Sequence, residues 1–137
     1  MHEEKLKHLE FIQNVITRMN TNSFLIRGWM ITLVSALFAL AAKDADSRYV
    51  IVTYIAIPVF WGLDAFYLSQ ERQYRDLYDD VRRKESTDFS MDASLYNIGK
   101  NTWSRTVFSK TMRILYPSML VIAILVMFWL GYHWTMR

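Results

Sequence analysis

The sequence predicts an all-α membrane protein with three transmembrane helices and a small cytosolic helical portion, folded as a single membrane domain over residues 1–137. The main observation is that charged residues are absent from three stretches and dense in the segments between them. The charge-free stretches are residues 28–42, 49–63 and 114–136. A soluble fold would interleave charged and apolar residues. Each stretch belongs to a segment of about 20 residues, the length that crosses a hydrocarbon core of about 30 Å.

Residues 1–23 are predicted to form a cytosolic amphipathic helix. Apolar side chains recur there at spacings of three and four, which gathers them on one helix face. They are Leu6, Leu9, Ile12, Val15, Ile16 and Met19. We expect this face to pack on the other cytosolic helices; membrane-surface binding is the alternative, although the polar face is not strongly basic. Asn20, Asn22 and Ser23 offer cap or hinge chemistry before the next segment.

The first predicted span is residues 24–42. Arg27 lies near its start, where its long side chain can extend to the interface. Two pairs of small residues at spacing four would let another helix approach closely. These pairs are Thr32 with Ala36 and Ser35 with Ala39. The polar loop 43–48 is so short that the first two spans must be antiparallel neighbours.

The second predicted span, residues 49–68, continues without a turn signal as a cytosolic helix to about Lys84. Oppositely charged residues four apart, such as Glu71 and Arg75, support this helix. Pro58 lacks an N–H and its ring clashes with the preceding turn, so we expect a kink there, with Gly62 one turn later.

The third part of the chain starts with a predicted loop over residues 85–101, with one short helical turn after Asp92. A helix over residues 102–113 is expected to feed directly into the third span, residues 114–134, which contains no charged residue. Aromatic residues of the cytosolic portion are expected to form a small core under the membrane. They are Tyr74, Tyr78, Trp103 and Phe108.

The distribution of Lys and Arg predicts the orientation. With three spans and a cytoplasmic N-terminus, thirteen of these residues lie inside and three outside. Cytoplasmic segments carry the excess of Lys and Arg in membrane proteins. We therefore expect a bacterial inner (plasma) membrane location with the N-terminus cytoplasmic and the C-terminus periplasmic or extracellular.

Arg27 and Asp64 are the charged pair that this topology brings together. Antiparallel spans place both near the cytoplasmic boundary, so an ion pair between them is expected. It is either a structural bridge that fixes helix register or a gating pair in an ion pathway. A gate in a transport path would need further polar residues deeper in the spans, which offer few.

No arrangement of residues predicts catalysis or cofactor binding. The three histidines, His2, His8 and His133, are not grouped with a nucleophile or into a metal site, and the sequence has no cysteine and no glycine-rich phosphate loop. We expect no catalytic residues, cofactor or metal, and no nucleic acid partner. The chain is predicted not to be an enzyme.

Several segments resemble a widespread family of small bacterial multi-span membrane proteins. They are RMNTNSF at 18–24, RGW at 27–29, FWGLDAFYLSQERQYRDLY at 60–78 and TDFSM at 87–91. This resemblance implies an architecture rather than an activity. The layout is also similar to the SLATT-type membrane effectors of anti-phage systems, a likeness that implies oligomerisation and membrane disruption, although those effectors usually have two spans.

These observations predict a non-enzymatic inner-membrane protein that self-associates in the lipid bilayer. As a homo-oligomer it would form a pore or a membrane-disrupting complex in phage defence, because three spans are too few to enclose a channel alone. The alternative is a membrane anchor whose cytosolic helices dock a soluble protein partner. A small ion or solute transporter that uses Arg27 and Asp64 is the third hypothesis.

Overall fold

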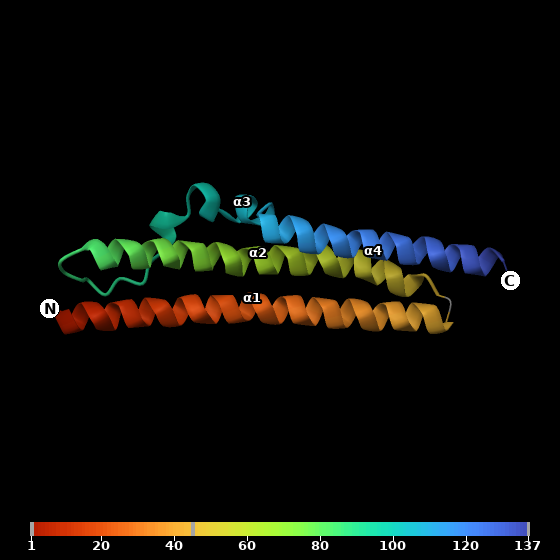
Figure 1. The fold of residues 1–137 in the computed structure, drawn as a ribbon, viewed down its shortest axis with the longest axis horizontal. Coiled ribbons are helices and arrows are strands. Elements are labelled where there is room, and N and C mark those ends of the chain that lie inside the picture. The colour runs from red at the N-terminus through yellow and green to blue at the C-terminus, as the bar shows by residue number, and fades with distance from the viewer. Residues whose placement is uncertain (1, 45, 137) are drawn as a thin grey trace.

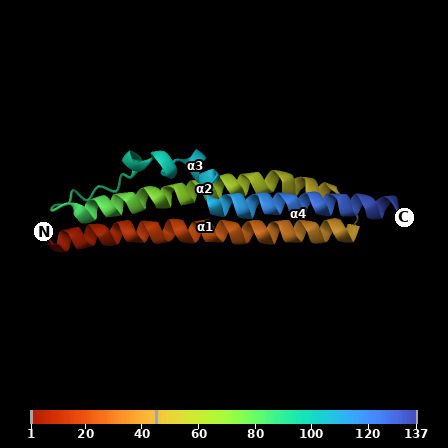
Figure 2. The same cartoon turned by 45° about the horizontal axis from the view of Figure 1, so that its top comes forward.

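The computed structural model describes residues 2–44 and 46–136, and these residues form helices and no strands. Three long helices make up the fold: α1 (His2–Asp44), α2 (Arg48–Arg83) and α4 (Lys110–Thr135). α1 and α2 run antiparallel, and α4 lies along the half of α2 nearer the α1–α2 connection (Figures 1 and 2). The all-α prediction is confirmed for this part of the chain, and all three helices are long and apolar enough to span a membrane.

α1 joins the predicted amphipathic helix and the predicted first span into one helix of 43 residues. The sequence predicts a cap or hinge at Asn20–Ser23, and that prediction is wrong because the helix continues through the segment. The Ser23 hydroxyl does not cap a helix end. It donates a hydrogen bond to the Asp64 carboxylate of α2.

α2 is likewise one helix of 36 residues that continues through Pro58. At about 1.5 Å per residue it is longer than the roughly 30 Å of a hydrocarbon core. Its N-terminal portion, yellow in Figure 1, slants toward the end of α1. The helix ends at Lys84, whose backbone is extended and whose N–H still bonds to the Val81 carbonyl.

The segment 84–109 folds back along α2 in three short pieces. These are the 3₁₀ turns η1 (Ser94–Tyr96) and η2 (Gly99–Asn101) and the five-residue helix α3 (Trp103–Val107). The predicted continuous helix from residue 102 into the third span is wrong, because α3 ends before Phe108 and α4 starts at Lys110. The indole N–H of Trp61 bonds to the Val107 carbonyl at 3.0 Å, and α4 starts anew after Ser109.

Three small apolar clusters lie along the length of the molecule. The first packs the N-terminal part of α1 and the C-terminal part of α2 with residue Ala93; the second and third pack the apolar parts of α1, α2 and α4. Their buried members are Ile12, Ile16, Leu77, Val81 and Ala93; Met30, Val34, Ile57, Met112 and Tyr116; and Ala41, Val50, Ala123 and Leu130. In the first cluster, which lies in the polar part of the molecule, each buried Ile, Leu or Val side chain contributes about 1.5–3 kcal/mol.

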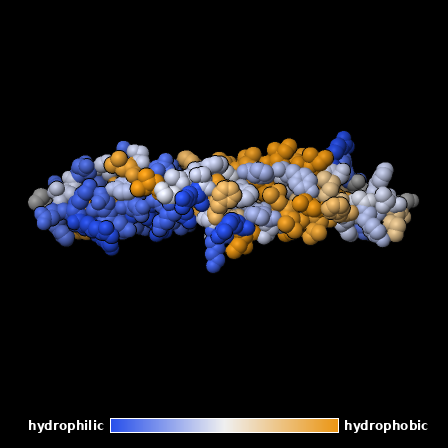
Figure 3. Space-filling model, turned by 90° about the horizontal axis from the view of Figure 1, so that it is seen from above, coloured by the Kyte–Doolittle hydropathy of each residue, from blue (hydrophilic) through white to orange (hydrophobic). Residues whose placement is uncertain are grey.

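The surface divides into two halves (Figure 3). The polar half contains residues 2–23 of α1, residues 69–83 of α2 and the segment 84–109. The apolar half contains the rest of α1 and α2 together with α4. Tyr74 and Tyr78 pack on the first cluster as expected. Trp103 and Phe108, expected beside them, are instead 51% and 65% exposed and do not belong to the first cluster.

Candidate functional site

Asp64 is fully buried where the polar and apolar halves meet. Its carboxylate accepts hydrogen bonds from two residues of α1 and one of α4. The Arg27 guanidinium donates through Nε to Oδ2 at 2.7 Å and through Nη2 to Oδ1 at 3.4 Å. The Ser23 hydroxyl donates to Oδ1, and the Tyr116 hydroxyl donates to Oδ2 at 2.7 Å. Three helices therefore meet at one carboxylate.

The spacing of residues explains how α1 and α2 build this site. Ser23 and Arg27 are four residues apart, so both side chains lie on the same face of α1. On α2, Trp61 lies one turn before Asp64 and stacks on Tyr116, with ring planes 2° apart and centroids separated by 5.8 Å. Trp61 therefore holds the ring of Tyr116 while Asp64 binds its hydroxyl.

The Asp64 carboxylate has its charge balanced and its hydrogen-bond acceptors occupied. A carboxylate offers about four acceptor positions, and the four hydrogen bonds divide equally between its two oxygens. The positive charge of Arg27 balances the buried negative charge, and such a balance is needed because an isolated ion in a protein interior is costly. This arrangement leaves no acceptor for a cation, so it favours the structural bridge over the gate.

Arg27 connects the site to a polar cavity. Its side chain is 28% exposed, whereas that of Asp64 is buried. The cavity measures about 280 Å³ and lies where α1, α2 and α4 approach one another. It is lined by Asn20, Ser23, Phe24, Arg27, Leu68, Glu71, Arg72 and Thr111. Water in this cavity can therefore reach the guanidinium but not the carboxylate.

Gly62 lies where α3 contacts α2, and the kink predicted at Pro58 and Gly62 stays a prediction. The Trp103 indole of α3 lies over it, and a Cβ added at this position would come within 3.7 Å of the Trp103 ring. Trp103 also donates its indole N–H to the Gly62 carbonyl at 3.0 Å. The Trp103 indole thus attaches α3 to α2 at Gly62, and α2 stays helical on both sides of it.

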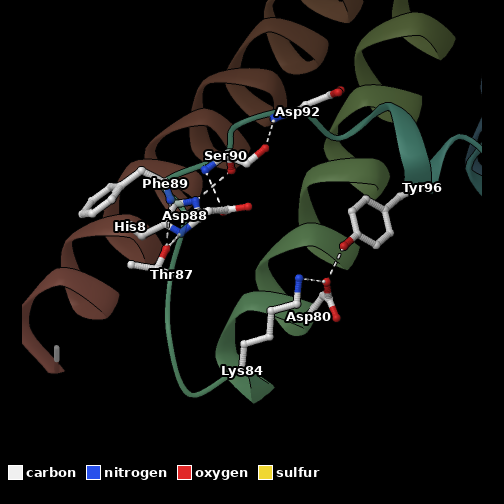
Figure 4. A network of polar contacts seen from close by, with 9 residues as sticks. All are labelled: His8, Asp80, Lys84, Thr87, Asp88, Phe89, Ser90, Asp92 and Tyr96. Carbon is white, nitrogen blue, oxygen red and sulfur yellow. Dashed lines mark hydrogen bonds and ion pairs between the residues drawn. The ribbon is translucent and has the colours of Figure 1, made fainter.

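A second buried polar cluster lies in the polar half and centres on His8 (Figure 4). Its Nε2 bonds to the Ser90 carbonyl at 2.8 Å, and its Nδ1 bonds to the Thr87 hydroxyl. Because a carbonyl oxygen only accepts, Nε2 carries a proton in this arrangement. His8 therefore fixes the loop after α2 against α1.

The loop at His8 has a left-handed residue. Phe89 has φ of 56°, a conformation that costs a non-glycine residue about 1–2 kcal/mol. Its ring packs 5.4 Å from that of His8, and its N–H bonds to the Thr87 hydroxyl at 3.2 Å. These contacts offset the backbone strain and close the loop over α1.

Tyr96 fixes the next part of the segment to α2 (Figure 4). Its hydroxyl donates to Asp80 Oδ2 at 2.6 Å, and Lys84 Nζ lies 3.1 Å from the same oxygen. The hydrogen bond from Tyr96, followed by that from Lys84, lowers the pKa of Asp80 below its ordinary value of 3.8. Burial and the bond to Asp80 raise the pKa of Tyr96 to about 12.

Sequence reasoning places Arg27 beside Asp64, and the structure has this ion pair. It misses Ser23 and Tyr116, which share no spacing pattern with Asp64 because they come from other helices. It also misses His8. The available signal was the position of this polar residue on the apolar face of an amphipathic helix. Of the other histidines, His2 is exposed and His133 lies beside the rings of Trp129 and Tyr132.

Within residues 2–44 and 46–136, no group of three or more His, Cys, Asp or Glu side chains could hold a metal ion. Comparison of the chain with protein-family models, with curated proteins and with solved structures finds no match. The resemblance to small bacterial membrane proteins and to SLATT-type effectors therefore stays a prediction.

Proposed function

We propose that the chain is a non-enzymatic protein of the bacterial inner membrane whose spans self-associate. The apolar half supports a membrane location, since only 17–28% of the most apolar stretch of each long helix is buried within the chain. Such wide apolar surfaces are stable in lipid and would favour aggregation in water. The excess of Lys and Arg in the polar half favours a cytoplasmic position for it.

The observation that carries self-association is a face of small residues on α1. Gly28 and the predicted close-approach residues lie on one side of the helix, and all of them are exposed. This small-residue face consists of Gly28, Thr32, Ser35, Ala36 and Ala39. α1 packs on α2 through its other side, where Met30 and Val34 are fully buried.

Small residues let helix backbones approach closely in lipid, where packing drives association. The small-residue face lies in the apolar half, beyond the reach of a soluble protein. A second copy of the chain carries the same face and is the simplest partner for it.

The test is the mass of the full chain purified in mild detergent, measured by light scattering and by cross-linking in membranes. Wild type is expected to form a defined oligomer. Gly28→Leu is expected to shift it toward monomer, because the added side chain keeps two α1 helices apart. Space around Gly28 is open within the chain, so the leucine fits the protomer itself.

Gly131→Leu is the matched control, because Gly131 is also a helical glycine in open space but lies on α4. It is expected to leave the oligomer mass unchanged. A wild-type chain that stays monomeric at all concentrations would refute the proposal, as would an unchanged oligomer in Gly28→Leu.

A pore or membrane-disrupting complex is the narrower form of this proposal, and anti-phage defence is the role that the SLATT likeness implies. Thr32 and Ser35 are exposed polar residues of the apolar half that such a complex would gather. Expression is expected to depolarise cells, and the purified oligomer to release dye from liposomes. An intact membrane potential at high expression would exclude the pore while leaving self-association standing.

A membrane anchor for a soluble partner is the second candidate, favoured by a patch in the polar half. Leu95 and Ile98 are 79% and 67% exposed on the segment that covers α2, away from the spans. In the proposed topology this patch lies outside the lipid, since Tyr96 of the same segment binds Asp80, about four turns beyond Asp64 on α2. If the wild type is monomeric and binds a soluble protein that Leu95→Ser releases, the anchor replaces the oligomer.

A further inference from the structure

A cavity lies at the end of the molecule where α1 and α2 connect. It measures about 600 Å³, within the range of small-molecule sites. α4 extends past this connection (Figure 1). Residues of its last turns line one side of the cavity, and residues around the connection line the other. In the proposed topology the cavity opens at the periplasmic boundary of the membrane.

The two walls differ in chemistry. Met127, Leu130 and Trp134 of α4 supply an apolar wall that continues into the surface proposed to face lipid. Trp134 is exposed, and indole rings favour the level of lipid headgroups. The opposite wall carries the charged residues Asp44, Asp46 and Arg48. A ligand for this cavity therefore needs an apolar part and a charged head.

Asp46 and Arg48 are already paired. Arg48 donates from Nε and Nη2 to both oxygens of Asp46 at 2.8–3.1 Å. The hydrogen bonds from Arg48 lower the pKa of Asp46, so its carboxylate stays ionised at neutral pH. Arg48 is 85% exposed, and a guanidinium has five N–H donors, so it can also bind an anion such as a phosphate.

Asp44 has acceptor capacity left. Its Oδ2 accepts one long hydrogen bond, 3.4 Å, from the Tyr49 hydroxyl. A carboxylate can accept about four, which leaves room for an ammonium group. The cavity thus offers a carboxylate for a cation, a guanidinium for an anion and an apolar wall for hydrocarbon.

We propose that this cavity binds a phospholipid with a primary-amine headgroup, of the phosphatidylethanolamine class. Its ammonium group binds Asp44, its phosphate binds Arg48, and its acyl chains lie along Met127, which is only partly buried. An uncharged glycerol headgroup lacks the cation for Asp44, and a trimethylammonium headgroup lacks N–H donors for it. The site rests on membrane insertion of the chain and not on self-association.

The test is native mass spectrometry of the full chain released from micelles that contain equal amounts of phosphatidylethanolamine, phosphatidylglycerol and phosphatidylcholine. Wild type is expected to retain phosphatidylethanolamine about tenfold better than the other two, the effect of one hydrogen bond to a charged group. Asp44→Asn is expected to abolish this preference, and Arg48→Gln to weaken retention of all three lipids.

Gly131→Leu tests the cavity itself. Gly131 lines the cavity and has open space around it, so a leucine projects into the site and narrows it without disturbing the helix. It is expected to lose bound lipid while the oligomer mass stays as in wild type. Gly28→Leu is the matched control, expected to keep the lipid whatever it does to the oligomer.

Equal retention of the three lipids by wild type would overturn the proposal and leave only non-specific annular lipid. Unchanged phosphatidylethanolamine retention in Gly131→Leu would overturn it as well. The same spectra give the oligomer mass, so failure of the lipid site and failure of self-association are read separately.

Discussion

The Asp64 site and the His8 cluster are both buried and polar, yet they hold the molecule in different ways. Asp64 joins three helices through a charged pair and two hydroxyl groups. His8 joins one loop to one helix through a hydroxyl and a carbonyl. Removal of one partner from a buried ion pair lowers the free energy of unfolding much more than the loss of one neutral hydrogen bond does. Helix register is therefore set at the junction of the halves, whereas the loop is held by weaker and more local contacts.

Removal of the buried charge is expected to have the largest effect on the free energy of unfolding. Asp64→Ala leaves Arg27 without its counter-charge and is expected to lower the free energy of unfolding by about 3–5 kcal/mol. Denaturant unfolding in detergent, followed by circular dichroism, measures it. Asp79→Ala is the control, because its 3.6 Å pair with Arg82 is half exposed and worth about 0–1 kcal/mol. Equal effects of the two variants would contradict the central role of Asp64.

Tyr116→Phe isolates the contribution of α4. It removes the 2.7 Å hydrogen bond to Asp64 and keeps the ring stacked on Trp61. The expected loss is about 1.5–3 kcal/mol, the value of a hydrogen bond to a charged group. The same unfolding assay measures it, with the exposed Tyr132→Phe as control. If Tyr116→Phe destabilises the Asp64→Ala protein as much as the wild type, the two groups are not coupled.

His8→Ala should affect only its own region. Loss of two hydrogen bonds, each worth about 1 kcal/mol, is expected to open the loop 85–93. Hydrogen exchange should become about tenfold faster or more at these amides and stay unchanged in α4. His2→Ala, an exposed histidine on the same helix, is the control. Faster exchange throughout α4 would show that the two clusters are not independent.

The smallest expected effect is a pH dependence at Tyr96. The pKa of Asp80 is lowered from 3.8, so its stabilising effect is present above that pH and disappears as pH falls through the lower folded value. The pKa of Tyr96 is raised from 10.0 to about 12, so its effect is present below pH 10.0 and disappears toward pH 12. The urea midpoint should therefore decline at both extremes.

Tyr96→Phe is expected to flatten both ends of this pH profile, because Asp80 loses the hydroxyl that lowers its pKa and the phenol no longer ionises. Tyr132→Phe should keep the wild-type profile. A Tyr96→Phe profile identical to that of wild type would show that the bond to Asp80 contributes nothing to the attachment of the segment.

The helices could be predicted from the sequence because hydropathy and charge act locally. The ion pair of Arg27 with Asp64 could also be predicted, since a short loop forces two antiparallel helices together. Ser23 could not be assigned, because a serine before an apolar stretch has the same local pattern whether it caps a helix or bonds across to another one. Its hydroxyl bonds to Asp64, and α1 stays continuous.

The break between α3 and α4 depends on contacts between distant residues. Periodicity from residue 102 onward suits one helix, but Trp61 binds the Val107 carbonyl and Trp103 rests on Gly62. Both indoles act across more than 40 residues of sequence. Tyr116 also depends on a distant residue, because its hydroxyl can bond to Asp64 only when α4 has packed on α2.

The partners of Asp64 are also synthesised in a fixed order. A chain is synthesised from its N-terminus, so Ser23 and Arg27 exist before Asp64 leaves the ribosome, and Tyr116 follows 52 residues later. The carboxylate therefore has its counter-ion available from the moment that it is made. Tyr116 completes the site last, and a nascent chain that stops short of α4 contains both members of the charged pair but lacks the contact that fixes the third helix.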